Sequence, residues 1–296
     1  MKIALVFNKE RGGTTGEYFE SPLVESGHAV RHFWTRDALQ MPSDFDLYIR
    51  IDHGDYKFDL PSFARPAVFY AIDTHLKRSF KKIACQAGHY DLVLCAQREG
   101  ALRLRAKGIE ARWLPLGCDP RVHAPDRELD RDLDIAFVGT DGKKSHRREL
   151  LESLKLRYPD SFFGMAEHTE MRNIYGRARV VFNYGIRNDI NMRVFEGMCA
   201  GALMVTNAPA GSAMEELFEE GHHLVVYKSD ADLYEKLDYY LSHEQDRQAI
   251  AMRGQERVLQ EHTYARRVLS LLNTSAHVLG GRYEQLKSWM PRVIYT

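Results

Sequence analysis

Short apolar runs alternate with polar turns and helix-like segments along the whole chain, and this alternation limits the folds that the chain can adopt. The first run, Lys2–Phe7, ends in a glycine-rich loop, and a helix-like segment and an alternating apolar run follow it. A strand, turn, helix and strand in this order are typical of a parallel α/β unit. Similar strand-like runs recur at residues 45–52, 66–73 and 90–97. We therefore expect an α/β protein with parallel sheets.

A charged, proline-containing segment at residues 119–132 interrupts this pattern. Its composition is typical of a linker between domains. The α/β pattern restarts at Leu133–Gly139 and ends in a helical tail with a break at Gly280 and Gly281. The sequence thus predicts two Rossmann-like domains and a tail, with these boundaries: residues 1–125, 126–275 and 276–296.

The composition excludes several classes of protein. Lys and Arg together number 41, as do Asp and Glu, so no net positive charge indicates a nucleic-acid partner. The N-terminus lacks a secretory signal pattern, and no run approaches the roughly 20 apolar residues of a transmembrane segment. The four cysteines form no C-x-x-C pair and are expected to be buried, reduced thiols. These features predict a cytoplasmic globular protein.

Glu196 lies in an otherwise apolar stretch, so its carboxylate needs an explanation. The residues from Val194 to Ala200 around it are apolar or small. A charge near a core is costly unless something pairs with it. Either Glu196 is on the solvent side of an amphipathic helix, or it binds a ligand. Asn191 can cap that helix, and the first N–H groups of the helix can bind an anion.

A basic loop follows the first strand of the second half and breaks a rule of helix electrostatics. Gly139 ends the strand and permits a tight turn. Four cations crowd the start of the next helix, where the helix dipole disfavours positive charge; they are Lys143, Lys144, Arg147 and Arg148. A bound anion would explain this arrangement, and a solvated basic loop is the alternative.

The first half has a glycine-rich loop of its own after its first strand. Gly12 and Gly13 lie in this loop. It has neither G-x-G-x-x-G nor Walker spacing, which argues against NAD and ATP. The two glycines could face phosphates or an acceptor, or they could form a plain turn.

Polar residues also follow later strands of the first half, where parallel sheets bind ligands. Asp73 and His75 come directly after one strand, and Asp52 and His53 form a weaker cluster after another. His75 could orient an acceptor or a reacting sugar, with Asp73 holding its imidazole. A structural histidine is equally consistent with the pattern.

Several motifs of the second half together resemble the CgeB-like group of glycosyltransferases. They are "IAFVGT", "SHRRELLESL", "EMRNIYGRARVVFNY", "DINMRVFEGMCAGALMVTN" and "HTYARRVLSLL". "FYAIDTHL" resembles the N-terminal half of the same group. The resemblance is strong over residues 133–272 and weaker before them. That group is related to retaining enzymes of the glycosyltransferase 4 type with the GT-B fold, in which two Rossmann-like domains face each other across a cleft.

The resemblance implies that a sugar passes from a nucleotide-diphosphate sugar to an acceptor hydroxyl, with retention. In this class the donor binds the C-terminal half and the acceptor meets the N-terminal half. A C-terminal helix commonly returns to the first domain. The acceptor class stays open among glycans, proteins and small molecules, and no essential metal or other cofactor is expected.

The resemblance also assigns roles to residues of this chain. Glu196 matches the second glutamate of an E-x7-E pattern, which holds the ribose hydroxyls of the donor. A carboxylate suits a vicinal diol because it accepts two hydrogen bonds. The other expected donor-binding residues are Asn191, Met192, Arg193, Arg147, Lys144, Gly139, Gly12 and Gly13.

This chain departs from the pattern at the first glutamate. The matching position holds Asn188, and Asp189 follows it. Either residue could replace the glutamate at the donor sugar, which leaves the sugar specificity and the catalytic detail open. The expected catalytic candidates are therefore His75, Asp73, Asn188 and Asp189.

Two other functions are compatible with the same sequence. The altered first glutamate motivates a non-catalytic module that binds a nucleotide sugar or serves in assembly. A nucleotide-sugar epimerase on the same scaffold is the other. Fold analogy alone does not choose among these functions.

Overall fold

The computed structural model describes residues 1–9, 13–125, 129–142 and 145–287. Contacts divide the chain into two compact units. Unit 1 is Met1–Pro115 together with the chain from Tyr264 onward, and unit 2 is Leu116–Thr263. Unit 2 begins and ends earlier in the sequence than the expected domain at 126–275, because the chain after Thr263 packs within unit 1.

Unit 1 is built on a six-stranded parallel sheet in the order β2-β1-β3-β4-β5-β6. The strands are β1 (Lys2–Val6), β2 (Ala29–Phe33), β3 (Leu47–Ile51), β4 (Ala67–Ala71), β5 (Leu92–Cys95) and β6 (Ala111–Trp113). Every residue of β3, β4 and β5 is buried. Continuous apolar runs form such strands because helices cover both faces of a parallel sheet.

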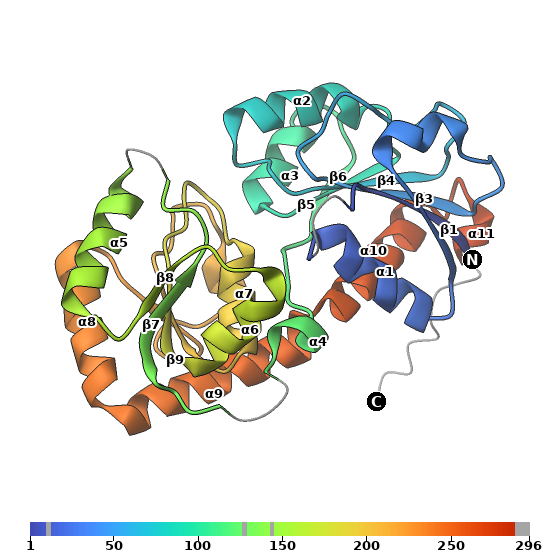
Figure 1. The fold of residues 1–296 in the computed structure, drawn as a ribbon. Coiled ribbons are helices and arrows are strands. Elements are labelled where there is room, and N and C mark those ends of the chain that lie inside the picture. The colour runs from blue at the N-terminus through green and yellow to red at the C-terminus, as the bar shows by residue number, and fades with distance from the viewer. Residues whose placement is uncertain (10–12, 126–128, 143–144, 288–296) are drawn as a thin grey trace. The chain divides into compact units, whose positions relative to one another are not determined.

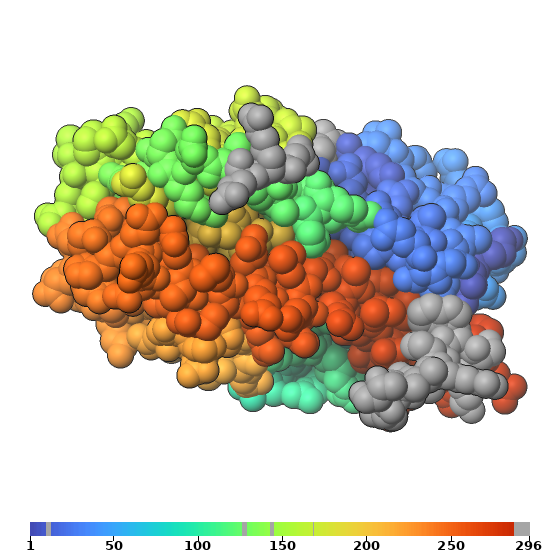
Figure 2. Space-filling view, turned by 90° about the horizontal axis from the view of Figure 1, so that it is seen from below, coloured from blue at the N-terminus to red at the C-terminus, as the bar shows by residue number. Residues whose placement is uncertain are grey.

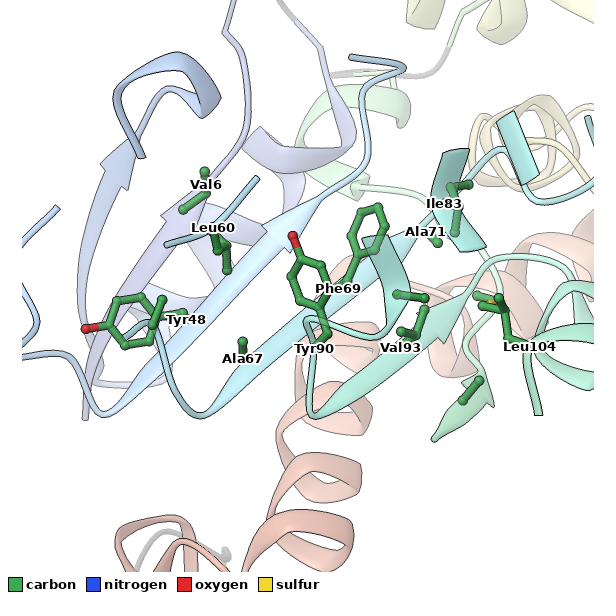
Figure 3. Packing of buried hydrophobic residues seen from close by; sticks show 14 of the residues in the cluster. Val6, Tyr48, Leu60, Ala67, Phe69, Ala71, Ile83, Tyr90, Val93 and Leu104 are labelled. Atoms are coloured by element: carbon green, nitrogen blue, oxygen red, sulfur yellow. The ribbon is translucent and has the colours of Figure 1, made fainter. Parts of the chain in front are cut away.

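Two pairs of helices cover the sheet of unit 1. On one side lie α2 (Lys77–Ala87) and α3 (Arg98–Arg105), and on the other lie α1 (Thr15–Glu25) and α10 (Tyr264–Leu279) (Figure 1). A 3-10 helix, η1 (Thr35–Gln40), and the short α11 (Glu284–Lys287) complete the unit. Figure 3 shows the core beneath α2 and α3, where the rings of Phe69 and Tyr90 stack 4.9 Å apart.

Helix α10 belongs to unit 1 because its first residue fills the core there. The ring of Tyr264 stacks on Tyr18 at 5.0 Å and meets the edge of Phe19 at 5.5 Å, and Tyr18 and Phe19 both lie on α1. Beyond α10, the hydroxyl of Tyr283 donates to Asp91 Oδ1 at 3.2 Å. Unit 1 thus consists of two separate stretches of the sequence.

Unit 2 is built on a five-stranded parallel sheet in the order β11-β10-β9-β7-β8. The strands are β7 (Leu133–Val138), β8 (Phe162–Gly164), β9 (Ala178–Asn183), β10 (Leu203–Thr206) and β11 (Val225–Val226). The prediction of two Rossmann-like α/β halves is confirmed. The two sheets have separate cores, as two domains require.

Helices lie on both sides of this second sheet. One side carries α5 (His146–Arg157) and α8 (Asp230–Ser242), and the other carries α6 (His168–Arg177) and α7 (Met192–Cys199) (Figure 1). The unit also contains α4 (Pro120–His123), η2 (Met214–Glu216) and α9 (Glu244–Glu261). Figure 2 shows exposed surfaces of α8 and α9, in orange.

Two expectations from the sequence need correction. Residues 119–132 were expected to form a linker, but Asp119 is 5% exposed, His123 is 1% exposed, and α4 lies in this segment as part of unit 2. All four cysteines were expected to be buried, but Cys85 is exposed on α2. Within the described residues, no helix is both long and apolar enough to cross a bilayer.

The chain enters and leaves unit 2 at neighbouring points. The N–H of Cys118 donates to the carbonyl of His262 at 3.0 Å, and Cys118 forms a β-bridge with Thr263. Gly117 precedes this contact, and a Cβ atom at Gly117 would lie 2.6 Å from the His262 carbonyl oxygen. Only glycine permits so close an approach of two backbones.

We expect Gly117→Ala to lower the free energy of unfolding by about 1–3 kcal/mol, because one backbone segment must move to admit the methyl group. Gly88→Ala is the matched control, since a Cβ atom at Gly88 has no atom within 4 Å. Denaturant unfolding of both variants measures the difference. Equal stability of the two variants would contradict the close packing at Gly117.

Candidate active site

A buried polar network lies at the carboxyl end of the sheet in unit 2. Asn183 ends β9, is 1% exposed, and donates through Nδ2 to Thr206 Oγ1 at the end of β10, 2.9 Å away. Its Oδ1 accepts hydrogen bonds from Asn191 Nδ2 at 3.0 Å and from Arg193 Nη1 at 2.7 Å. Asn183 therefore joins two strands to helix α7.

Arg193 is half-buried and bonded to its own sheet. Its Nε and Nη2 donate to the carbonyl of Val138, the last residue of β7, at 3.1 and 2.9 Å. The guanidinium centre lies 4.0 Å from the ring centroid of Phe137. Arg193 thus satisfies a strand-end carbonyl and places a permanent positive charge there. Its expected contact with a donor stays a prediction.

Gly139 makes room for this arginine. Its φ is +147°, in the region that side chains rarely adopt, and a Cβ atom there would lie 2.5 Å from Arg193 Nη2. The tight turn expected at Gly139 is therefore also the place where the backbone approaches the guanidinium.

Helix α7 begins directly after Asn191, in the expected capping position. The side chain of Asn191 makes no capping hydrogen bond, however; its amide nitrogen donates to Asn183 Oδ1. The expected capping by the side chain is therefore wrong. A helix start without a side-chain cap leaves backbone N–H groups that a bound anion can satisfy. Met192, the first residue of α7, is half-buried beside them.

Glu196 is buried on α7. It is 7% exposed, so the alternative that it lies on the solvent side of the helix is wrong. Burial raises the pKa of its carboxyl group to about 7, although the positive charge of Arg193 opposes this rise. The Nε2 atom of His123 lies 3.5 Å from Oε1 of Glu196. A buried carboxylate with a shifted pKa and a specific neighbour is typical of functional sites.

Asn188 and Asp189 lie in the turn between β9 and α7. Each is 7% exposed, and the N–H of Asp189 donates to the carbonyl of Ile186 at 3.3 Å. Arg187 holds the turn with a φ of +56°. The turn thus buries Asn188, which holds the position of the first glutamate of the pattern, and Asp189, which follows it. Their catalytic role stays a prediction.

Arg147 lies in the first turn of α5 and is half-buried. Its Nε donates to the carbonyl of Asp141 at 3.2 Å, and in the described part of the chain no carboxylate pairs with it. Burial lowers its pKa, and the positive charge of Arg193 lowers it further. Two cations that disfavour each other in this way create the positive potential that an anion seeks.

A cavity of about 350 Å³ adjoins Gly139. The ends of β7 and β8 and one face of α5 enclose it, with Phe137, Leu151 and Phe163 as its apolar walls. Such a volume and lining suit a flat, mostly apolar group of a ligand. Thr140 and Asp141 supply polar atoms at its rim.

The glycine-rich loop of unit 1 is only partly visible. Gly12 lies outside the described residues, as does Lys144 in unit 2. The N–H of Gly13 donates to Glu17 Oε2 at 2.7 Å, within the capping box of α1. Glu17 places a carboxylate where a phosphate would bind, so this contact favours the plain-turn alternative for Gly13.

Asp52 organises the carboxyl edge of the sheet in unit 1. It is 5% exposed, and its Oδ2 accepts hydrogen bonds from the N–H groups of Ile72 at 3.0 Å and Asp73 at 3.3 Å. The hydroxyl of Tyr56 donates to the same oxygen at 3.1 Å. Asp52 thus fixes the loop that carries Asp73.

The same loop carries His75 on its next turn. Thr74 precedes it, is 1% exposed, and donates to Gln97 Oε1 at 2.6 Å. His53 lies at the end of the neighbouring strand, with its Nε2 3.2 Å from Thr35 Oγ1. His75 and Asp73 are both half-buried, and their roles with an acceptor stay predictions.

Sequence reasoning missed three residues of unit 2 that hold the site together. Asn183 and Thr206 end apolar strands, and a polar residue in that position was the signal available. His123 gave no signal, because its segment resembles a linker. Among the residues that the structure describes, no group of three or more His, Cys, Asp or Glu side chains is placed to hold a metal.

Comparisons with known proteins relate this chain to glycosyltransferases. A family model described as "Glycosyl transferase-like" matches residues 124–273, which include Asn183, Arg193 and Glu196 but not His123. None of the curated protein sequences compared with this chain matches it.

Solved structures of glycosyltransferases have the same fold as this chain. HepE of Anabaena, in complex with UDP-glucose, is 12% identical with a TM-score of 0.63, over 94% of this chain and 100% of that one. Sucrose-phosphate synthase of Thermosynechococcus elongatus is also 12% identical, with a TM-score of 0.66, over 95% and 100%. A DNA-modifying β-glucosyltransferase, studied with uridine diphosphoglucose, is 14% identical with a TM-score of 0.62, over 94% and 99%. These matches identify the fold as GT-B.

The raised pKa of Glu196 predicts a dependence of stability on pH. Between its ordinary value of 4.5 and about 7, the unfolded chain has released a proton that the folded chain keeps. Raising the pH through this window therefore lowers the stability of the wild type, by roughly 3 kcal/mol in total. We expect Glu196→Gln to lack this loss. The free energy of unfolding of the variant should therefore increase relative to that of the wild type between pH 4.5 and 7.

Glu235→Gln is the matched control, because Glu235 is exposed on α8. Denaturant unfolding at several pH values measures all three proteins. A constant difference between Glu196→Gln and the wild type across this range would show that the carboxyl group has no raised pKa.

Proposed function

The chain belongs to the glycosyl transferase-like family, and we propose that it transfers a sugar from a nucleotide-diphosphate sugar to an acceptor hydroxyl. One observation carries this proposal. A buried carboxylate, Glu196, and two cations, Arg147 and Arg193, lie on helices that follow strands of the same sheet. A nucleotide-diphosphate sugar offers a diol for the carboxylate and a diphosphate for the cations.

Each part of the donor has a place in this proposal. Glu196 accepts hydrogen bonds from the ribose hydroxyls, and the start of α7 and Arg147 bind the diphosphate. The base enters the cavity beside Gly139, against the apolar side chains of Phe137, Leu151 and Phe163. Lys144 is a further cation for the diphosphate. Asn188 and Asp189 face the sugar.

The reaction needs stabilisation of the leaving nucleotide. Bond breaking at the sugar leaves negative charge on the diphosphate, and fixed cations stabilise this charge more in the transition state than before it. No carboxylate of the described residues forms an ion pair with Arg147, although the charge of Asp141 partly offsets its own. We therefore propose transfer without an essential metal. By the resemblance of its motifs, we also propose retention and membership of the CgeB-like group.

The acceptor is proposed to meet the carboxyl edge of unit 1. His75 and Asp73 lie on a loop that the buried Asp52 fixes, so their backbone positions are set before a ligand arrives. A glycan, a protein or a small molecule could supply the hydroxyl. UDP-sugars are the first donors to test, because HepE and the β-glucosyltransferase were solved with UDP-glucose or studied with it.

A binding screen followed by product analysis tests this function. UDP, GDP, dTDP, CDP and ADP are compared by thermal shift with Mg²⁺ and with EDTA, since a ligand of the folded state raises its apparent stability. The nucleotide that binds then selects the sugars for product analysis, with and without acceptors. Stabilisation by one diphosphate in EDTA supports the proposal, and no stabilisation by any of them contradicts it.

The altered first glutamate favours one other candidate function. With Asn188 in its place, the chain could bind a nucleotide sugar without turnover. Tight donor binding with neither transfer nor hydrolysis across acceptor classes would identify this binding module. Conversion of the donor sugar without an acceptor would identify an epimerase instead.

We expect Arg147→Ala to weaken binding of the preferred nucleoside diphosphate by about tenfold to a hundredfold, because a charged hydrogen bond to phosphate is lost. Binding of the nucleoside without phosphates should stay unchanged. Arg157→Ala is the matched control, since Arg157 lies on the same helix and pairs with Asp238 at 2.5 Å on the surface. Calorimetric titration measures the affinities. Equal affinities in the two variants would exclude a phosphate contact for Arg147.

A further inference from the structure

The segment that leads from unit 1 into unit 2 carries a buried histidine. His123 ends α4, and its side chain has no exposed surface. The N–H of Asp119, at the start of α4, donates to His123 Nδ1 at 2.9 Å. Because Nδ1 accepts this hydrogen bond, the neutral ring carries its proton on Nε2.

That nitrogen lies beside the carboxylate of Glu196. Nε2 of His123 lies 3.5 Å from Oε1 of the carboxylate, whose side chain is 9% exposed. The backbone of Asp119 thus fixes both the orientation and the tautomer of the ring. A neutral donor in this place favours the ionised form of a carboxylate that burial disfavours.

Three other described groups interact electrostatically with Glu196. Arg193 lies on α7 itself and is bonded to the strand ends. Tyr175 on α6 and Cys118 before α4 are close enough for the charge of Glu196 to raise their pKa values. From β9, β10 and α9, which also pack against α7, no described residue contributes a charge that shifts the pKa of Glu196.

We propose that His123 is a positioning residue for Glu196, whose Oε1 it holds so that Oε2 accepts a ribose hydroxyl of the donor nucleotide. This inference rests on the proposed function, because it assigns the ligand of Glu196. A second contact ties the same segment to α7: the thiol of Cys199 hydrogen-bonds with that of Cys118 and, together with burial, raises its pKa. The segment from Cys118 to His123 therefore packs together with α7.

Two substitutions separate this role from a structural one. The amide of asparagine reaches the place of Nδ1, so His123→Asn can keep the contact with Asp119 but loses the donor toward Glu196. The amide of glutamine reaches the place of Nε2, so His123→Gln keeps that donor and loses the contact with Asp119. A positioning role is damaged by Asn and preserved by Gln, and a purely local structural role is damaged in the opposite order.

The binding experiment compares UDP with 2′-deoxy-UDP from pH 5.5 to 8.5. If the screen selects another base, the matching ribose and deoxyribose pair replaces it. In the wild type, affinity for UDP should rise with pH as Glu196 ionises. We expect His123→Asn to bind UDP about tenfold more weakly at pH 7 and to move this rise to higher pH, because its carboxylate has lost a donor.

His123→Gln should recover most of the lost affinity, and 2′-deoxy-UDP should respond little to either change. Glu196→Gln should bind UDP weakly at every pH. The inference would be overturned if His123→Asn had the affinity and pH profile of the wild type. It would also be overturned if only His123→Gln lost affinity for UDP.

A readout without ligand keeps this inference distinct from the proposed function. Carbon-13 NMR of labelled glutamate carboxyl groups follows the titration of Glu196, identified by its absence in Glu196→Gln. The pKa of Glu196 should be higher in His123→Asn than in His123→Gln. If this order holds but no nucleotide binds the wild type, the proposed function fails and the coupling of the two residues stands. If the order is absent, the inference fails even where nucleotides bind.

Discussion

The hydrogen bonds of Arg193 to the strand ends are the interaction on which the rest of the site depends. One guanidinium joins the last carbonyl of β7 to the last side chain of β9, and its own backbone belongs to α7. Parallel strands end in unsatisfied carbonyls, and the arginine supplies donors that cannot lose their charge. Gly139 leaves space for the guanidinium because it has no side chain, and Asn183 accepts a hydrogen bond from it. Because the same helix carries Glu196, the position of the carboxylate follows from where Arg193 is held.

The charged side chains of the site are in surroundings that disfavour their charged forms. Burial and the nearby charge of Arg193 lower the pKa of Arg147, and burial raises the pKa of Glu196 to about 7. Each arrangement costs stability in the empty protein. A ligand with a diphosphate and a diol would relieve both costs together. The proposal that the site binds a nucleotide therefore has physical support apart from the similarity to solved glycosyltransferases.

The fold could be predicted from the sequence because strands of a parallel sheet are buried on both faces and therefore form continuous apolar runs. Glu196 could be found for a related reason, since a carboxylate in an apolar helix contradicts its surroundings. The supporting residues could not be found in this way. Asn183 acts through three partners that are distant in the sequence or on another element, and His123 lies in a segment whose prolines and charges resemble a linker. The boundaries also depended on a contact between distant segments, the packing of Tyr264 on α1.

That packing has a consequence for the order in which the protein is made. The sheet of unit 1 and α1 leave the ribosome first, but α10, which covers Tyr18 and Phe19, follows only after all of unit 2. Unit 2 is a continuous stretch, so its core can close while unit 1 still waits for its last helix. During translation the exposed aromatic face of α1 is a surface for chaperones or for mistaken association with other nascent chains. A chain that stops within α10 would contain a complete unit 2 and an unfinished unit 1.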